Sequence, residues 1–217
     1  MGKLKVNELF SGIGAQAKAL ERLGIDHEIV GISDIDKYAN QSYGAIHGKV
    51  HQYGDISKVE RLEYADLWTY SSPCQDFSVS GKQKGLIDEN GNKTRSGLLL
   101  EIQRLLGVAK EEGTLPKYLL LENVKNLVGK KFKPDFDKCL QTLDELGYNT
   151  YWKVLNAKDY GVPQNRERVF VVSIRKDLSQ TFTFPEKEPL RKRLADVFEP
   201  EVDEKYYITD EKAQKLL

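Results

Sequence analysis

Apolar runs and amphipathic segments alternate along the 217-residue chain, a pattern typical of strands that are each followed by a helix. The runs predict strands over residues 6–10, 29–33, a short segment ending by 55, 67–71, 118–121, 150–155 and 169–173. Helical spacing predicts helices over residues 15–24, 37–46, 98–112 and 135–146. This alternation predicts an α/β fold, with a mostly parallel twisted sheet and helices on both faces.

The periodic pattern is interrupted in two places. Residues 76–97 contain four glycines and several charges, which predicts a long loop. After Pro185 the pattern breaks again, and the chain ends in a short apolar helical pattern. We therefore expect one main domain over residues 1–185, and a linker with the start of an incomplete second region over 186–217. A frayed terminal helix is the alternative for the last residues.

The composition narrows the class of protein. The hydrophobic content of 40% and charged content of 30% are those of a globular chain, and the lack of a long apolar run predicts a cytoplasmic protein without a membrane span. Two cysteines and three histidines, none at metal-ligand spacing, predict reduced thiols and no metal. Lysine plus arginine (33) equals aspartate plus glutamate (33), so the chain lacks the general positive charge of many DNA-binding domains.

A glycine-rich turn follows the first predicted strand. Gly12, Ile13 and Gly14 lie between Phe10 and the first helix, and Asp34 lies at the end of the second strand. Glycines at such a turn permit close approach to a nucleotide, and a distal carboxylate accepts hydrogen bonds from ribose hydroxyls. A dinucleotide dehydrogenase would have the same pattern, and so would a turn that needs glycine only for packing.

Further polar residues follow other strands at the predicted carboxyl edge. Asp55 could meet the amino group of an adenine there, or could simply begin a helix with the help of Ser57. Pro73 keeps the preceding backbone extended and is followed by Cys74, which is either a nucleophile or an inert core residue. Cys139 lies on the apolar face of a predicted helix, so we assign it to the core.

Charged residues at two more strand ends add to this edge. Glu122 ends the apolar run 119–121, where it could act as a proton donor or be an ordinary surface acid at a helix start. Arg166 and Arg168 alternate into the last strand, so both side chains point the same way. An exposed charged edge strand would show the same alternation.

Taken together, these motifs resemble the DNA (cytosine-5)-methyltransferase family of the bacterial and phage type. The resemblance covers residues 4 to about 175, where the motifs occur in the family's order: Phe10-x-Gly12-x-Gly14, Asp34-Ile35-Asp36, Gly54-Asp55-Ile56, Pro73-Cys74-Gln75, Gly81-Lys82-Gln83, Glu122-Asn123-Val124 and Gln164-x-Arg166-x-Arg168. It implies a Rossmann-like, S-adenosylmethionine-dependent methyltransferase fold, with residues 1–185 as the cofactor-binding and catalytic domain. A dehydrogenase would account for only the first motif.

The resemblance also implies an activity and a set of site residues. The chain would transfer a methyl group from S-adenosylmethionine to carbon 5 of a flipped-out cytosine in double-stranded DNA, leaving S-adenosylhomocysteine. The cofactor would be held by Phe10, Gly12, Ile13, Gly14, Asp34, Ile35, Asp55, Ile56 and Pro73. Cys74 would attack carbon 6, Glu122 would share a proton with the base, Arg168 would contact it, and Arg166 would orient Glu122 or bind phosphate.

The predicted loop is expected to contact the DNA and close over the base through Ser78, Ser80, Gly81, Lys82 and Gln83. A surface loop without function is the alternative. We expect target recognition to be supplied by a C-terminal complement, on the same polypeptide or on a partner. Two other functions remain open: an RNA (tRNA) cytosine-5 methyltransferase, and a non-catalytic cofactor-binding subunit. The sequence recognised, and any link to a restriction enzyme, cannot be read from these residues.

Overall fold

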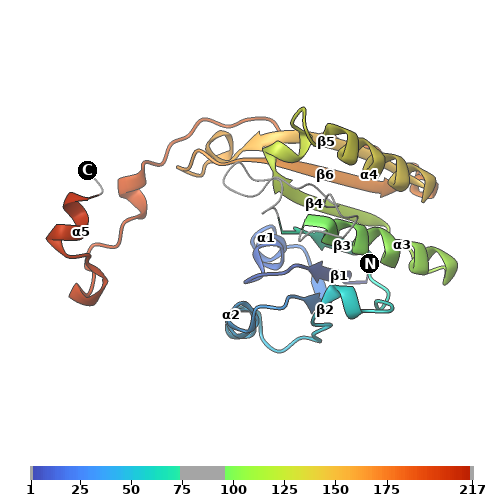
Figure 1. Cartoon of the computed structure of the whole chain (residues 1–217), viewed down its shortest axis with the longest axis horizontal. Coiled ribbons are helices and arrows are strands. Elements are labelled where there is room, and N and C mark those ends of the chain that lie inside the picture. Colours follow the sequence, from blue (N-terminus) through green and yellow to red (C-terminus); the bar gives the residue numbers. More distant parts are fainter. Residues whose placement is uncertain (1, 74–95, 216–217) are drawn as a thin grey trace. The chain divides into compact units, whose positions relative to one another are not determined.

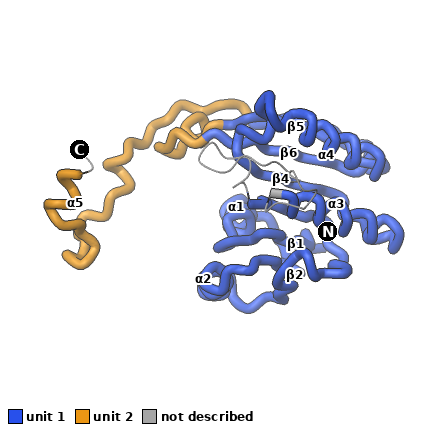
Figure 2. The backbone as a smooth tube through the Cα atoms, in the orientation of Figure 1, with its two compact units in different colours: residues 1–155, 167–185 blue, residues 156–166, 186–217 orange. Residues whose placement is uncertain are grey.

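The structure is a computed structural model that describes residues 2–73 and 96–215. The chain forms two compact units, coloured separately in Figure 2: Met1–Leu155 with Glu167–Pro185, and Asn156–Arg166 with Glu186–Leu217. The last segment of the first unit ends at Pro185. The segment Asn156–Arg166, which we expected within the main domain, groups with the second unit.

The first unit is built on a six-stranded sheet with the strand order β2-β1-β3-β4-β6-β5 (Figure 1). The strands are β1 (Leu4–Leu9), β2 (His27–Ser33), β3 (Leu67–Tyr70), β4 (Tyr118–Val124), β5 (Tyr148–Asn156) and β6 (Glu167–Arg175). The first four run parallel, and β6 pairs antiparallel with β4. The prediction of a mostly parallel sheet is confirmed.

Helices cover both faces of this sheet, as predicted. They are α1 (Ala15–Arg22), α2 (Lys37–His47), α3 (Leu99–Glu111) and α4 (Lys133–Glu145). Side chains alternate along β1, so Glu8 faces α1 and α2 and accepts hydrogen bonds from both. Leu9 faces the opposite way, into a core that includes Leu105 of α3 and Phe136 of α4. The two helix pairs therefore pack on opposite faces.

One predicted strand is wrong. Before Asp55 the described chain forms only a single parallel bridge, between Ile32 and Gln52. Gly54 then adopts a left-handed conformation, with φ of 75°, and the chain turns into the short 3-10 helix η1 (Ile56–Lys58). The reversal leaves no extended run that could pair further. A second strand is longer than predicted: β4 continues through Glu122 and Asn123 to Val124, beyond the predicted end at residue 121.

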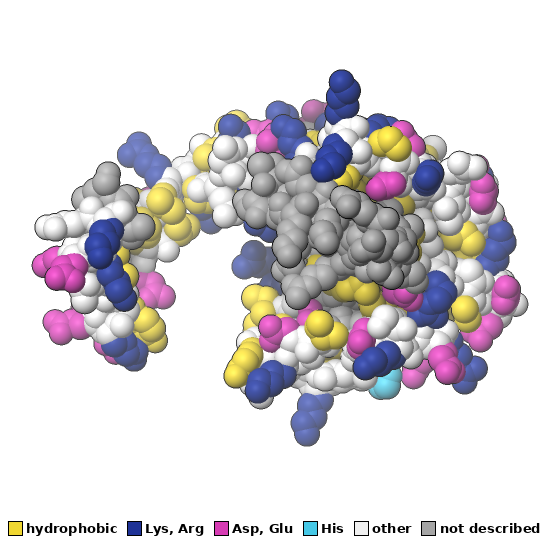
Figure 3. All heavy atoms as spheres, viewed as in Figure 1, with side chains coloured by type: hydrophobic (Ala, Val, Ile, Leu, Met, Phe, Trp, Pro, Cys, Tyr) yellow, Lys and Arg dark blue, Asp and Glu magenta, His cyan; other side chains and the backbone are white. Residues whose placement is uncertain are grey.

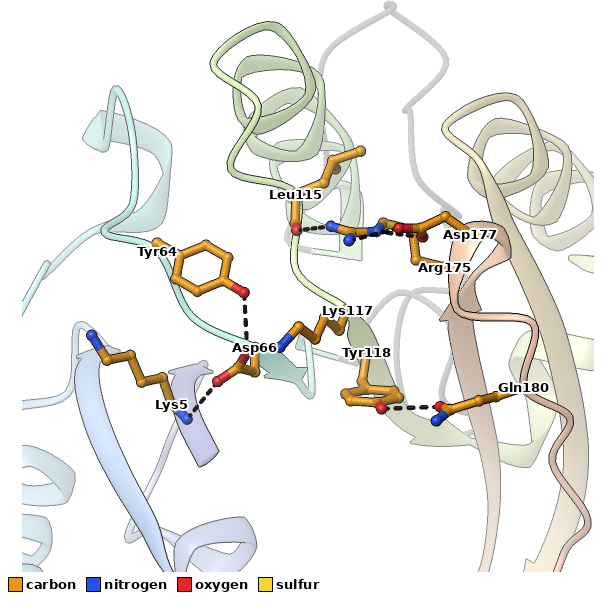
Figure 4. A network of polar contacts seen from close by, with 9 residues as sticks. All are labelled: Lys5, Tyr64, Asp66, Leu115, Lys117, Tyr118, Arg175, Asp177 and Gln180. Atoms are coloured by element: carbon orange, nitrogen blue, oxygen red, sulfur yellow. Dashed lines mark hydrogen bonds and ion pairs between the residues drawn. The ribbon is translucent and has the colours of Figure 1, made fainter. Parts of the chain in front are cut away.

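A polar network closes the amino-terminal edge of the parallel strands (Figure 4). Asp66, just before β3, accepts hydrogen bonds from the Lys5 amide (3.1 Å) and the Tyr64 hydroxyl (3.0 Å), and pairs with Lys117 (2.8 Å). Nearby, Arg175 at the end of β6 pairs with Asp177. It also donates a hydrogen bond to the carbonyl of Leu115, in the segment that leads into β4. These contacts join β1, β3, β4 and β6 at the edge opposite the candidate site.

The second unit contains little regular structure. Its helical turns are η4 (Ala157–Tyr160), η6 (Leu194–Val197), η7 (Glu204–Tyr206) and α5 (Asp210–Gln214). The Glu188 amide donates to the Asp159 carbonyl (2.9 Å), and Lys187 pairs with the Asp159 carboxylate (2.7 Å). None of the side chains described in this unit is fully buried. A helix does form at the predicted apolar end, over five residues.

Candidate active site

The glycine-rich turn after β1 has an unusual backbone. Phe10 has φ of 58°, in the left-handed region that non-glycine residues rarely adopt, and Gly12 and Gly14 have φ of 54° and 84°. At Gly14 an added Cβ would collide with the His47 ring and would lie 2.7 Å from Cε2 of Tyr43. Glycine is therefore required at position 14 by backbone conformation and by the packing of α2.

A buried carboxylate supports this turn from within the sheet. Glu8 Oε1 accepts from the Ala17 amide (2.9 Å), and Oε2 accepts from the Tyr43 hydroxyl. Burial raises the pKa of Glu8, although these hydrogen bonds partly oppose the rise. His47 lies 3.2 Å, through Nε2, from the Ile13 carbonyl. This support was not predicted from the sequence, although an acid inside an apolar strand was a signal for it.

Asp34 ties the end of β2 to the glycine-rich turn. Its Oδ2 accepts from the Gly12 amide (2.8 Å), and its Oδ1 accepts from the Asp36 amide (2.9 Å). Asn40 donates to the Asp34 carbonyl (3.0 Å). Each carboxylate oxygen keeps a second lone pair, so the group can still accept hydrogen bonds from a ligand.

Asp55 begins the turn that carries η1. It accepts from the Ser57 hydroxyl (2.7 Å) and amide (3.0 Å), and these two hydrogen bonds lower its pKa. The Ser57-assisted helix start that we left open is therefore present. The turn is also held by the buried Ser33 hydroxyl, which donates to the Gly54 carbonyl (2.7 Å). Asp55 nevertheless lines the pocket described next.

A pocket lies at the carboxyl edge of β1, β2 and β3. Its empty space is about 580 Å³, a volume that includes space open to solvent. Its lining residues are Phe10, Ser33, Asp34, Ile35, Gly54, Asp55, Ile56, Ser71, Pro73 and Leu98. Apolar side chains suit the flat face of a base, and two carboxylates suit hydroxyl and amino groups. This combination of apolar side chains and hydrogen-bond acceptors therefore fits a nucleoside such as that of S-adenosylmethionine.

Asn123 joins β4 to the segment that leads to Cys74. Its buried amide group donates to the carbonyl of Ser72 (3.1 Å) and approaches the Ser72 hydroxyl (3.3 Å). Pro73 is thereby held at the wall of the pocket. Cys74 lies outside the described residues, as do Ser78, Ser80, Gly81, Lys82 and Gln83.

Glu122 and Arg168 form an ion pair across the antiparallel strands. Arg168 Nε lies 3.0 Å from Glu122 Oε1, and both side chains are about one quarter exposed. Arg168 also donates through Nη1 to the Glu167 carbonyl (2.8 Å). The pair lies at the same edge of the sheet as the pocket, because the parallel strands end there and β6 begins there. It offers a carboxylate, with a guanidinium beside it, to a ligand.

The other two candidates have contacts of their own. Arg166 belongs to the second unit, where its amide donates to Asn156 Oδ1 (3.1 Å) and its carbonyl accepts from the Ala157 amide (3.0 Å). Cys139 is buried in the core on α4, as we expected, and burial raises the pKa of its thiol to about 11. A thiol with such a pKa is almost entirely protonated near neutral pH, so Cys139 is poorly suited to nucleophilic attack.

Residues 2–73 and 96–215 contain neither a metal-binding cluster nor a helix that could span a membrane. Among these residues, no group of three or more histidine, cysteine, aspartate or glutamate side chains is arranged to hold a metal ion. Within the same part of the chain, none of the helices combines the length and the apolar character that crossing a membrane requires.

Comparisons with known proteins agree with this arrangement. Residues 4–216 match the family model of C-5 cytosine-specific DNA methylases. Over 94% of its length the chain is 38% identical to the type II methyltransferase M2.ScrFI of Lactococcus lactis subsp. cremoris, and over its whole length 36% identical to the orphan methyltransferase M.SPBetaI of Bacillus phage SPbeta. The chain spans 70% and 62% of those two relatives, and 48% of the orphan methyltransferase M.Rho11sI of Bacillus phage rho11s.

The fold is also found in solved structures. The Dnmt2 methyltransferase of S. pombe superposes with a TM-score of 0.72 at 27% identity, covering 99% of this chain and 65% of that one. The Entamoeba histolytica methyltransferase EhMeth superposes with a TM-score of 0.73, covering 96% of this chain and 64% of that one; at 21% identity it supports the fold alone. The predicted fold of S-adenosylmethionine-dependent methyltransferases is therefore confirmed.

Proposed function

Because the chain belongs to the C-5 cytosine-specific DNA methylase family, we propose that it transfers a methyl group from S-adenosylmethionine to carbon 5 of cytosine in DNA. One observation carries the proposal: the Glu122–Arg168 pair and the pocket lined by Asp34 and Asp55 lie at the same edge of the sheet. An S-adenosylmethionine site and a group that handles protons on a base are what the reaction needs together. A dehydrogenase would need only the pocket.

Each residue of the site would hold a different part of the cofactor. Asp34 would accept hydrogen bonds from the ribose hydroxyls, and Asp55 would accept from the adenine amino group. Ile35 and Ile56 would lie against the adenine, and Pro73 would lie toward the reactive methyl group. Phe10 lines the pocket, and Gly12, Ile13 and Gly14, in the turn that follows it, would hold the cofactor from beside the pocket. When bound, S-adenosylmethionine supplies an electrophilic methyl group on a sulfonium.

The chain's own side chains prepare the base to receive this methyl group. The Cys74 thiolate forms a bond to carbon 6 of the cytosine, which gives carbon 5 the electron density of an enamine carbon. Glu122 shares a proton with N3 as negative charge enters the ring, and Arg168 hydrogen-bonds O2. Carbon 5 would then accept the methyl group as the methyl–sulfur bond breaks, with S-adenosylhomocysteine as the leaving group. Loss of the proton from carbon 5 to water or hydroxide, followed by cleavage of the sulfur–carbon bond, restores the thiolate.

Contact with double-stranded DNA is proposed for the segment between β3 and α3, and for a partner region. Ser78, Ser80, Gly81, Lys82 and Gln83 contact the phosphates and close over the flipped base. Arg166 binds a phosphate. Acidic and basic side chains are intermingled over the described part of the face in Figure 3, in keeping with a net charge of zero. A C-terminal complement would supply base recognition.

Trapping on modified DNA tests the proposal. Fluorine at carbon 5 of cytosine cannot leave as the proton does, so the chain should remain covalently joined to DNA that contains 5-fluorocytosine when S-adenosylmethionine is present. Recovery of a Cys74–cytosine peptide would support the mechanism. Failure to trap on DNA, together with methylation of a transfer RNA, would contradict it. In parallel, S-adenosylmethionine and not NAD should raise the melting temperature.

A further inference from the structure

We propose that Arg104 of α3 is a positioning residue for the cofactor, because it joins two walls of the pocket to each other. One wall is the Asp55 turn, residues 54–59, and the other is the start of α3 at Leu98. Arg104 itself does not line the pocket. The inference rests on the proposed function, since it concerns how the S-adenosylmethionine site is held in shape.

The Arg104 guanidinium reaches across to the Asp55 turn. Its Nη2 donates to the carbonyl of Val59 at 2.6 Å and approaches the carbonyl of Ile56 at 3.4 Å. These are carbonyls of η1 and of the residue that ends it, so a cation lies at the negative end of this turn. Asp55 and Ile56 belong to the same turn and line the pocket. Holding the carbonyls therefore fixes where Asp55 and Ile56 stand.

The guanidinium is itself held in place within α3. Arg104 Nε donates to Oε2 of Glu101 at 2.7 Å, and the Glu101 side chain is only 6% exposed. The two residues lie one turn apart on the helix. The guanidinium donates to a buried carboxylate on one side and to backbone carbonyls on the other, which fixes its orientation. The ammonium group of a lysine could not make both sets of contacts in the same geometry.

Helix α3 connects Arg104 to Leu98 at the opposite wall of the pocket. Leu98 lines the pocket one residue before α3 begins, and Ile102 and Leu105 anchor the same helix in the core. An α-helix is a stiff element, and Leu98 directly precedes its first residue, so we expect Leu98 and Arg104 to move together. A shift of the Asp55 turn relative to Leu98 would then stretch the Arg104 contacts. The width of the adenine-binding part of the pocket is set by this arrangement.

A simpler explanation is that the packing of Ile56 alone fixes the position of the Asp55 turn. Its side chain is 3% exposed and packs in the main core. If this packing were sufficient, loss of the Arg104 guanidinium would leave Asp55 in place. The two explanations therefore differ in what happens when the guanidinium is removed and the apolar stem of the side chain is kept, as in Arg104→Met.

Arg175 offers a matched control. It also pairs with an acid in its own segment, Asp177 (2.7 Å), and donates to a distant backbone carbonyl, that of Leu115 (2.8 Å). It lies in the amino-edge network of Figure 4, at the opposite edge of the sheet from the pocket. Arg175→Met should therefore reproduce the general cost of losing such an arginine, without an effect on the cofactor site.

The first measurement needs no ligand. Hydrogen exchange of the full chain should show faster exchange at the amides of residues 55–59 in Arg104→Met, and not in Arg175→Met. Denaturant unfolding would show that both variants are folded. Unchanged exchange over 55–59 in Arg104→Met would overturn the inference, whatever the chain binds. Faster exchange there, in a chain that binds no S-adenosylmethionine, would leave the positioning role standing and the proposed function refuted.

The second measurement is affinity for S-adenosylhomocysteine by calorimetry. Loss of a charge-assisted hydrogen bond predicts about tenfold weaker binding in Arg104→Met, partial recovery in Arg104→Lys, and no loss in Arg175→Met. Asp55→Ala is then combined with Arg104→Met. If Arg104 acts through the Asp55 turn, the double variant should lose less affinity than the product of the single losses. Multiplicative losses, or a loss equal to that of the control, would overturn the inference.

Discussion

Arg168 Nε lies 3.0 Å from Glu122 Oε1, and the two residues are diagonal neighbours on adjacent antiparallel strands. In the register of β4 and β6, Val124 lies opposite Arg168 and Glu122 lies opposite Phe170. Residues two apart on a strand share a face, so the pairing places both charged side chains on one side of the sheet. The separation of the two groups is therefore set by backbone ladder bonds rather than by a loop.

Glu122→Gln should lower the rate of methyl transfer by about a hundredfold or more, because an amide can hydrogen-bond the base but cannot share the proton. The single-turnover rate with labelled S-adenosylmethionine and DNA measures this effect, and DNA affinity should change much less. Glu167→Gln is the matched control: Glu167 is adjacent in β6 to Arg168 and pairs with Lys125 on the surface. Equal rates for wild type and Glu122→Gln would leave Glu122 a structural residue only.

Cys74→Ser should abolish trapping on 5-fluorocytosine DNA, while Cys139→Ser should keep it. The thiol of Cys139 is buried with its pKa raised to about 11, so it provides little thiolate near neutral pH. Mass spectrometry of the trapped peptide identifies the attached cysteine. Binding of S-adenosylhomocysteine to Cys74→Ser should stay within a few fold of wild type. An adduct on Cys139 would reverse the assignment.

Gly14→Ala should destabilise the chain more than Gly12→Ala. Both positions have positive φ, so each substitution carries a backbone cost of about 1–2 kcal/mol. Only at position 14 does the new methyl group also collide with Tyr43 and His47; at Gly12 nothing lies within 4 Å of it. Urea unfolding measures the difference in the free energy of unfolding. His47→Ala should recover part of the extra loss at position 14, and no recovery would rule out the steric explanation.

Glu8→Gln should change how stability depends on pH. Burial raises the pKa of Glu8 in the folded chain above its ordinary value of 4.5, so the folded carboxyl holds its proton where the unfolded one has lost it. The stability this gives is fully present below pH 4.5 and is lost as pH rises through the folded pKa. The amide of the variant does not titrate. The free energy of unfolding of Glu8→Gln should therefore rise, relative to wild type, as pH increases from about 4 to 7.

Asp66→Asn provides the control of opposite sign. Partial burial by itself raises the pKa of Asp66, but hydrogen bonds from Lys117, the Lys5 amide and Tyr64 together bring it below its ordinary value of 3.8. The resulting stability is present above pH 3.8 and is lost as pH falls through the folded pKa. Asp66→Asn should thus be less stable than wild type at neutral pH, with the difference shrinking in acid. Parallel pH profiles for the two variants would contradict both assignments.

The alternation of apolar runs was sufficient to predict the helices and most of the strands, because burial on both faces leaves a strong pattern in a parallel sheet. It failed before Asp55, where a left-handed Gly54 and a single bridge replace the predicted strand. Local sequence does not report whether a short run finds a partner strand. The extension of β4 to Val124 was missed for a related reason: pairing with β6 continues through the polar Glu122 and Asn123.

The residues that could contact ligands were easier to find than those that hold them. Asp34, Asp55 and Pro73, each picked out by a motif, all line one pocket. The sequence did not indicate that Tyr43 would reach Glu8, or that Arg104 would reach the carbonyl of Val59, because these pairs are separated by 35 and 45 positions. Such contacts depend on how helices pack on the sheet, and helix packing leaves no local signature at either residue.

The antiparallel insertion of β6 beside β4 also bears on how the chain folds. A contact between Glu122 and Arg168 closes a long stretch of chain that includes α4 and β5, so it carries a large loop-closure entropy and a high contact order. The glycine-rich turn, by contrast, forms from neighbours along the chain. We expect this turn to be native early in refolding. The pocket, which also needs Ser71 and Leu98, and the Glu122–Arg168 pair should form only when the later strands and helices dock.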